Sequence, residues 1–157
     1  ALVGEAAKAA DYAAGLRQRM DAIAVQSAQL ALRPKVYFEE WDEPLISGIQ
    51  WVAELIRIAG GNDIFPELAA ESLAKQRIMA DGSAVIARNP DIIFGSWCGK
   101  KFRPEKVIAR PGWQDIAAVR RNQLFEIKSP LILQPGPAAL TDGLQAMAAH
   151  IQAWSKS

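Results

Sequence analysis

Residues 35–45 constrain the fold of this chain more than any other stretch. The first four have strong strand propensity, and within a few positions they give way to three acids and a tryptophan. Pro44 should end any strand here, because proline has no N–H to donate to a sheet and keeps the preceding residue extended. A buried strand that stops at carboxylates and an indole is typical of the ligand-binding mouth of an α/β protein. A strand followed by a solvated acidic turn is the simpler alternative.

Size and charge exclude several classes of protein. The chain has 157 residues, of which 50% are hydrophobic and 22% charged, so we expect one folded domain rather than disorder. The formal net charge of +1 gives no reason to expect binding to nucleic acid or to an anionic membrane. No apolar run approaches the roughly 20 residues that cross a bilayer, so we predict no membrane insertion. The single Cys98 excludes an intrachain disulfide.

The beginning of the chain predicts one long helix over residues 5–31. Small and apolar side chains recur there at alternating spacings of four and three, which gives a single narrow stripe: Ala9, Ala13, Leu16, Met20, Ile23, Ser27 and Leu30. Such a helix is about 40 Å long, more than one small α/β lobe needs on its surface. It therefore either pairs with another chain or joins this lobe to a second one. The chain lacks a start methionine and a signal peptide, so we expect a mature product or a fragment.

After residue 34, strands alternate with helices three times. We predict strands at 35–38, 91–96 and 124–127, helices at 47–59, 81–88 and 111–119, and a last helix from Pro137 with Leu140, Leu144, Met147, Ile151 and Trp154 buried. Ser47 is the expected cap of the first of these helices, and Gly60 and Gly61 its end. Residues 62–80 are expected to be irregular. This alternation predicts an α/β fold with a parallel sheet flanked by helices, and loops gathered on one edge.

Two sets of side chains are candidates for catalysis. Glu39, Glu40 and Asp42 could supply acid–base chemistry, but neighbouring strand residues point to opposite faces, so the two glutamates cannot act as a pair. We favour ligand contacts or loop hydrogen bonds, and predict no metal site because no histidine or fuller set of oxygen ligands accompanies them. Cys98 and His150 could act as nucleophile and base. The histidine lies beside the apolar stripe of the last helix, which favours a surface residue.

Aromatic and basic residues near the predicted mouth loops point to a ligand. Trp41, Trp97 and Trp113 fall in or beside these loops, as loop packing or as a platform for a wide, flat ligand. Nearby cations could pair with anionic groups of such a ligand, although a solvated charge run is the simpler interpretation: Lys75, Arg77, Lys100 and Lys101. The acids at 39–43 argue against single-stranded nucleic acid. No glycine pattern for phosphate or dinucleotide binding occurs.

Five segments together resemble a known family. They are PKVYFEEWD at 34–42, ELIRIAGGNDIF at 54–65, ARNPDII at 87–93, RPGW at 110–113 and LQPGP at 133–137. In this order and spacing they resemble the C-terminal lobe of periplasmic binding proteins for cobalamin and iron-siderophores, which deliver their ligand to an ABC importer. The resemblance covers essentially the whole chain. It implies two Rossmann-like lobes with a ligand between them, residues 1–33 as the helix that bridges the lobes, and residues 34–157 as the C-terminal lobe.

The resemblance also implies a function and a set of contacts. The ligand would be cobalamin, a ferric siderophore or a haem-like chelate, with no cofactor apart from cobalt or iron within the ligand, no catalysis, and a periplasmic or extracytoplasmic location. The implied ligand contacts are Glu40, Trp41, Asp42, Leu45, Arg77, Trp97, Cys98, Leu131, Leu133 and Gln134. The permease is the implied partner, and Asp81 and Ser83 stand where members usually carry a docking glutamate. Lys75, Gln76 and Arg77 stand where cobalamin binders often carry an aromatic residue, which favours an anionic chelate.

Two other functions remain alternatives at this point. The chain could be a small standalone α/β enzyme that uses Cys98 or the acids at 39–42. It could also be an interaction module whose long first helix dimerises. If the chain is half of a binding protein, its exposed helix stripe and inter-lobe face are expected to favour self-association.

Overall fold

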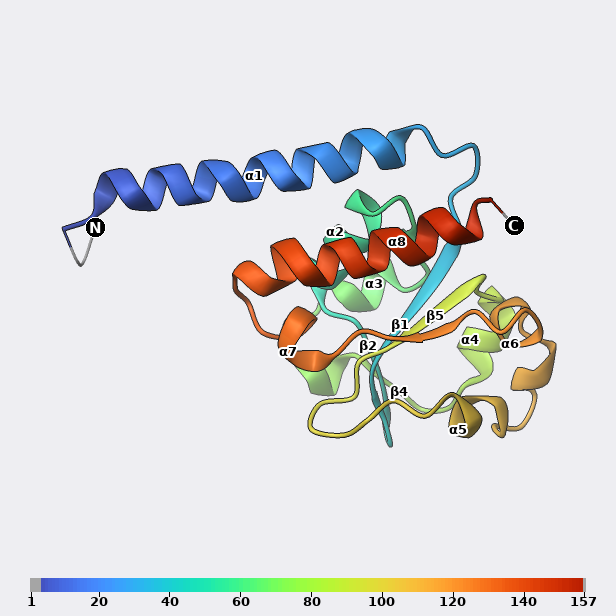
Figure 1. The fold of residues 1–157 in the computed structure, drawn as a ribbon. Coiled ribbons are helices and arrows are strands. Elements are labelled where there is room, and N and C mark those ends of the chain that lie inside the picture. Colours follow the sequence, from blue (N-terminus) through green and yellow to red (C-terminus); the bar gives the residue numbers. More distant parts are fainter. Residues whose placement is uncertain (1–3, 157) are drawn as a thin grey trace.

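The computed structural model describes residues 4–156 as one sheet covered by helices, with a long helix projecting from it (Figure 1). The helices are α1 (Ala6–Ala28), α2 (Gln50–Ile58), α3 (Pro66–Ala69), α4 (Ser83–Arg88), α5 (Pro104–Ile108), α6 (Ala117–Arg120), α7 (Ser129–Ile132) and α8 (Leu144–Trp154). The strands are β1 (Lys35–Asp42), β2 (Leu45–Ser47), β3 (Asn62–Asp63), β4 (Ile78–Met79), β5 (Ile92–Gly95) and β6 (Leu124–Glu126). Two 3₁₀ turns, η1 (Ala74–Gln76) and η2 (Trp113–Asp115), and a π-helical segment, η3 (Ala139–Gly143), complete the order.

The sheet has the strand order β4-β2-β1-β5-β6, and β3 pairs with the first residues of β1. The strands β1, β3, β5 and β6 run parallel, as predicted for an α/β fold, whereas β2 pairs antiparallel with both β1 and β4 and makes the sheet mixed. The prediction that the first strand ends near Phe38 was wrong. The strand continues to Asp42 and turns back into β2, with Pro44 in the turn, where no N–H is needed.

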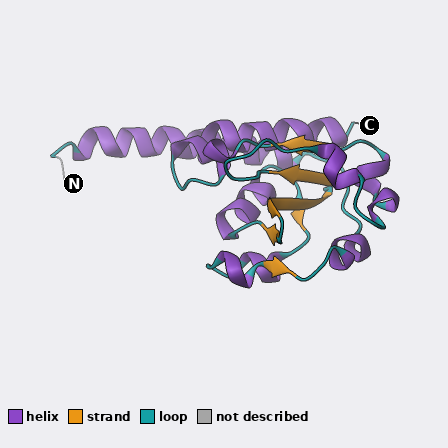
Figure 2. Ribbon diagram, turned by 90° about the horizontal axis from the view of Figure 1, so that it is seen from below, coloured by secondary structure: helices purple, strands orange, loops and turns teal. Residues whose placement is uncertain are grey.

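Apolar residues pack against both faces of the sheet, because alternate residues of each strand point to opposite faces. On one face Val36 and Phe38 pack with residues of α2 and α8, including Leu55 and Met147. On the other face Tyr37 packs with residues of α4, α5, η2 and α6. Figure 2 shows these helices around the strands. The continuous apolar run of β5 is buried throughout, as its composition predicted.

The predicted long helix is confirmed as α1, which has 23 residues. Its stripe becomes more buried along the chain: Ala9 is exposed, Leu16 and Met20 are half-buried, and Ser27 is buried. The helix therefore packs on α2, η3 and α8 only through its later turns, while its first turns project away from the sheet (Figure 1). Gly60 has the left-handed conformation predicted at the end of α2, with φ +98°.

Other local expectations need correction. Ser47 ends β2 and does not cap α2, which begins at Gln50 because the hairpin occupies the residues before it. The short helices α5 and α7 were not predicted, although each carries a proline in its first turn. In the last helix Leu144, Met147 and Ile151 are buried as expected, whereas Leu140 and Trp154 are only half-buried. None of the helices between residues 4 and 156 combines the length and apolar content needed to cross a bilayer.

We predict that Gly95→Ala destabilises the chain, because a Cβ at this position would lie 1.9 Å from Cδ2 of the Phe102 ring. Such overpacking should lower the free energy of unfolding by about 1–3 kcal/mol or more, measured by urea denaturation. Gly136→Ala is the matched control, since its Cβ would meet nothing within 4 Å. Equal stability of the two variants would contradict the packing of Phe102 on Gly95.

Candidate ligand-binding site

Three parallel strands end side by side at one edge of the sheet, and their ends and following loops form the candidate site. They are residues 39–42 at the end of β1, residues 96–101 after β5 and residues 127–131 after β6. Ligands of α/β proteins bind at the carboxyl ends of parallel strands, so a ligand of this chain is expected at this edge. The prediction that the mouth loops lie on one edge is confirmed by the parallel pairing of these strands.

Glu39 is fully buried, and both oxygens of its carboxylate accept hydrogen bonds. Arg110 donates from Nη1 to Oε2 at 2.7 Å and from Nη2 to Oε1 at 2.8 Å, and Trp97 Nε1 donates to Oε1 at 2.9 Å. Burial alone would lower the pKa of Arg110, but the hydrogen bonds and charge of Glu39 outweigh it and raise that pKa above its ordinary value. Burial chiefly, and then the Glu39 carboxylate, raise the pKa of nearby Tyr37 well above its ordinary value. Glu39 thus joins β1 to the loop after β5 and to the segment before η2.

Glu40 has different partners from Glu39, in agreement with the expectation that the two point apart. Its Oε2 accepts a hydrogen bond from Arg77 Nη1 at 2.5 Å, and the same nitrogen donates to the backbone carbonyl of Ser47. The Arg77 side chain is only 2% exposed. Arg77, the residue before β4, thus bonds to Glu40 of β1 and to Ser47 of β2, and so holds these strands together.

Asp42 forms the third ion-paired centre at this edge. Its carboxylate is buried and pairs with the ammonium of Lys100, while Nζ of Lys106 lies 3.8 Å from its Oδ2. Lys100 also lies over two indole rings, with Nζ 4.1 Å from the ring centroid of Trp41 and 5.2 Å from that of Trp97. These contacts fasten the loop after β5 onto the end of β1.

The three tryptophans expected at the mouth do not form one exposed platform. Trp97 and Trp113 are each only 2% exposed: Trp97 packs edge-on to Phe102, and Trp113 lies in the core beneath Arg110. Only Trp41 is partly accessible, and its Nε1 donates to the backbone carbonyl of Glu43 at 2.8 Å. An indole buried at the end of a strand is therefore mainly loop packing here.

A pocket of about 420 Å³ opens between the loops after β5 and β6. Its lining includes Trp97, Gly99, Lys100, Lys101, Glu126, Lys128, Ser129 and Pro130. Glu126 uses its Oε1 to accept the backbone N–H of Phe102 at 3.0 Å. The sequence did not mark Lys128 and Ser129, although they directly follow a predicted strand and could have been found on that ground.

The remaining predicted contacts are spread around this edge. Leu45 begins β2 and is half-buried; like Trp41, it packs against the core on the face of the sheet that holds Tyr37. Cys98 is exposed in the loop after β5. Leu131 lies in α7. Leu133 follows that helix and packs against the core on the face of the sheet that holds Val36 and Phe38, and Gln134 is exposed.

The two residues expected to dock on a permease come just after β4, whose last residue, Met79, pairs with Leu45 next to the end of β1. The Asp81 carboxylate accepts the backbone N–H of Ser83 at 2.9 Å before α4, and hydrogen bonds from Ser83 hold the pKa of Asp81 below its ordinary value. Asp81 is therefore charged at neutral pH, and both residues are exposed.

The structure does not bring Cys98 and His150 together as a nucleophile and its base. His150 stacks on the ring of Phe125, with 3.9 Å between centroids, and burial lowers the pKa of its imidazole. It therefore lies against the middle of β6, whereas Cys98 lies in the loop beyond the end of β5. Over residues 4–156 there is no group of three or more His, Cys, Asp or Glu side chains arranged to hold a metal ion.

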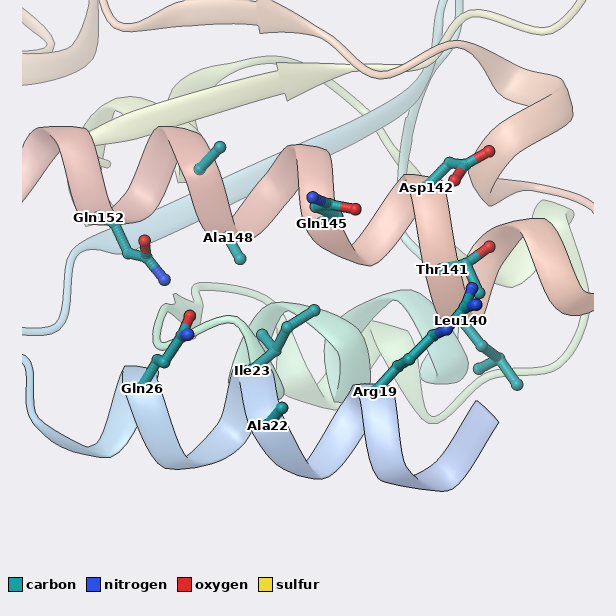
Figure 3. A pocket seen from close by; sticks show the side chains of 11 residues that line it. Arg19, Ala22, Ile23, Gln26, Leu140, Thr141, Asp142, Gln145, Ala148 and Gln152 are labelled. Atoms are coloured by element: carbon teal, nitrogen blue, oxygen red, sulfur yellow. The ribbon is translucent and has the colours of Figure 1, made fainter. Parts of the chain in front are cut away.

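A second pocket, of about 480 Å³, lies away from the strand ends, between α1 and the last helix (Figure 3). Ala22, Ile23 and Ala148 lie between the two helices, and polar residues such as Arg19, Gln26 and Gln152 border it. We assign the candidate site to the carboxyl edge because its charged and aromatic side chains converge there.

A family model described as "Periplasmic binding protein" matches residues 1–131. The chain belongs to the periplasmic binding protein family.

Solved structures agree with this assignment at the level of the fold. A periplasmic binding protein from Veillonella parvula is 24% identical with a TM-score of 0.73, over 93% of this chain and 51% of its own. The vitamin B12-binding protein BtuF of Vibrio cholerae is 22% identical with a TM-score of 0.67, over 90% of this chain and 52% of its own. The S. aureus protein IsdE, solved with heme, is 18% identical with a TM-score of 0.75, over 92% of this chain and 57% of its own. No curated protein matches the chain.

This periplasmic binding protein chain thus spans about half the length of the structures it matches. The resemblance to a C-terminal lobe of cobalamin and iron-siderophore binding proteins, noted from its sequence segments, is confirmed. Arg110, which the RPGW segment contains, is the partner of buried Glu39 that the sequence did not identify. A buried carboxylate needs a cation beside it, so a cationic partner for Glu39 could have been predicted. The sequence does not show that this cation is Arg110.

We predict that Arg110→Leu lowers the free energy of unfolding by about 3–5 kcal/mol, because it leaves the buried Glu39 carboxylate without its cation. Arg103→Ala is the matched control, since the Arg103–Glu105 pair is exposed and should contribute less than about 1 kcal/mol. Both are measured by urea denaturation. A loss of similar size in the two variants would show that Glu39 does not depend on Arg110.

Asp63, at the opposite edge of the sheet, gives a pH dependence that is unrelated to the site. Burial raises its pKa from 3.8 to about 6, although hydrogen bonds from the backbone of Phe65 and Ile64 partly offset this. The folded chain holds this proton more tightly than the unfolded chain, so the stability contributed by protonated Asp63 is lost as pH rises from about 4 through 6.

We therefore predict that Asp63→Asn raises the free energy of unfolding above pH 6, by about 3 kcal/mol, and flattens its fall between pH 4 and 6. Asp21→Asn, at an exposed position on α1, is the control and should leave the pH profile unchanged. Denaturation in urea across pH 4–8 measures both. An unchanged pH profile in Asp63→Asn would contradict the burial of this carboxyl.

Proposed function

We propose that the chain is the C-terminal lobe of the substrate-binding protein of an ABC importer for cobalamin, a ferric siderophore or a haem-like chelate. The observation that carries this is the family match over residues 1–131 together with coverage of only about half of each matched structure. Two of those structures are described as binding vitamin B12 and heme, and a third is an Fe3+-hydroxamate transport protein of Saccharomonospora viridis. The protein would act by capture and delivery, without catalysis.

In this proposal residues 1–33 bridge to a second lobe and residues 34–157 form the ligand-binding lobe. The first turns of α1 support that role because they project beyond the sheet and their stripe is exposed within the described residues 4–156 (Figure 1). The ligand would lie over the carboxyl edge, against Trp41, Leu45, Leu131 and the loop at 97–101. A periplasmic or extracytoplasmic location is part of this proposal, and the family match supports it.

The permease is the proposed partner, and the exposed acid before α4 is the proposed contact. Asp81 is fully solvated and charged, and Ser83 begins the helix beside it. A carboxylate of this kind could pair with permease arginines. Glu40, Asp42 and Arg77 would act indirectly in this proposal, by holding the mouth in shape, because each is committed to an internal ion pair.

The test is tryptophan fluorescence of the two-lobed protein during titration with cyanocobalamin, a ferric hydroxamate and hemin. We expect saturable quenching by one of them at micromolar concentration or below, because Trp41 and Trp97 lie at the mouth. Trp41→Phe should reduce the quenching, whereas Trp154→Phe, at the far end of α8, should not. The 157-residue chain alone should bind the same ligand more weakly, because half a cleft contacts half a ligand. Flat titrations with all three ligands, using folded protein, would refute the proposal.

A further inference from the structure

We propose that the lysines at the mouth bind free carboxylate groups of the ligand, so that the site selects a carboxylate-bearing chelate over a neutral corrinoid. This inference rests on the proposed function and specifies its ligand. The pocket between the loops after β5 and β6 carries Lys100, Lys101 and Lys128 on its lining, with Glu126 as the only acid there. Lys100 is paired with Asp42, so the free charge of the pocket is that of Lys101 and Lys128 against Glu126, which leaves the pocket cationic.

The acids at 39–42 do not cancel this charge, because each is paired with a cation. Glu39 is held by Arg110, Glu40 by Arg77, and Asp42 by Lys100 and Lys106. The acidic cluster that dominates the sequence at 39–42 is therefore neutralised internally and would not repel an anion. The Glu126 carboxylate accepts a neutral donor, the backbone N–H of Phe102, and keeps its single negative charge against the two lysines.

The free charge at this edge belongs to Lys101 and Lys128. Both side chains are exposed, and neither has an ion-pair partner within residues 4–156. They come from two different loops, one after β5 and one after β6, and line the same pocket of about 420 Å³. Two ammonium groups on adjoining walls can pair with the carboxylates of one ligand, whereas a ligand without charge would leave them solvated.

Lys100 has a different role, because its ammonium is fixed between Asp42 and the indoles of Trp41 and Trp97. It positions the loop that carries Lys101. Replacing Lys100 would also leave the Asp42 carboxylate without its nearest cation, so this residue is unsuitable as a probe of ligand charge. Lys101 and Lys128 can be changed without breaking an internal pair.

Two kinds of ligand carry the required carboxylates, a tetrapyrrole with acidic side chains and a ferric carboxylate chelate. The experiment therefore titrates the two-lobed protein with hemin, with hemin dimethyl ester, which has the same ring but no free carboxylates, with ferric citrate and with cyanocobalamin. The variant is Lys101→Glu/Lys128→Glu, and Lys156→Glu, an exposed lysine near the end of α8, is the matched control. Circular dichroism checks that each variant is folded.

We expect wild-type protein to bind hemin or ferric citrate more tightly than cyanocobalamin, and more weakly as salt is added. The double variant should raise the Kd of that anionic probe by roughly tenfold or more, because attraction becomes repulsion, while Lys156→Glu leaves it unchanged. If hemin is the ligand, its dimethyl ester should bind more weakly and be insensitive to the charge reversal. If ferric citrate binds and hemin does not, the carboxylates belong to a chelate rather than to a tetrapyrrole.

Two results would overturn the inference. Tight binding of cyanocobalamin, or equal binding of hemin and its ester, with no effect of the double variant would refute it while leaving the proposed function standing. Absence of binding to every probe by folded wild-type protein, including the ferric hydroxamate used above, would refute the proposed function and the inference with it.

Discussion

The architecture of the mouth depends on the burial of a single carboxylate. Glu39 lies with no exposed surface at the end of β1, and an isolated charge in that position would be strongly unfavourable. Arg110 and Trp97 offset this by donating three hydrogen bonds to it from two separate segments of the chain. The carboxylate therefore fixes the start of the loop after β5 and the segment before η2 relative to the same strand.

The same arrangement recurs at Glu40 and Asp42. Arg77 reaches Glu40 from the segment before β4, and Lys100 reaches Asp42 from the loop after β5. Each acid of the strand thus holds a different neighbouring segment. A mouth held in this way is ordered before a ligand arrives, which reduces the conformational entropy that binding would otherwise cost. This is consistent with the proposed role of the chain as one lobe of a ligand-capturing protein.

Much of the fold was predictable from local pattern, because long apolar stripes and buried strand runs report directly on burial. The stripe of α1, the apolar run of β5 and the glycine end of α2 were all read correctly on those grounds. The β1–β2 hairpin was not, because the prediction ended the first strand at Phe38 and began a helix at Ser47, whereas residues 45–47 pair back on β1. Short helices such as α5 and α7 depend on tertiary packing more than on propensity, so only their prolines hinted at them.

The site was harder to predict than the fold, because residue type at a strand end does not reveal which charges are already paired. Glu40, Asp42 and Arg77 looked like groups available to a ligand, yet each is paired within the protein. Glu40 pairs with Arg77, which is 37 positions away in the sequence, and Asp42 pairs with Lys100 from the loop after β5. The sequence likewise gave no sign that Trp97 would donate to Glu39 instead of facing solvent. Lys128 appeared unremarkable beside these residues.

Pairing thus divides the charges of the mouth into two groups with different physical effects. Paired acids and cations set the positions of loops, and because their charges largely cancel they contribute little to the field at the opening. Unpaired lysines contribute the field that a ligand meets, and salt screens that field because they are exposed. The chemical character of the pocket is therefore set by the side chains that have no ion-pair partner among the described residues. Between the loops after β5 and β6 these are the lysines Lys101 and Lys128, although the neighbouring strand β1 ends in acids.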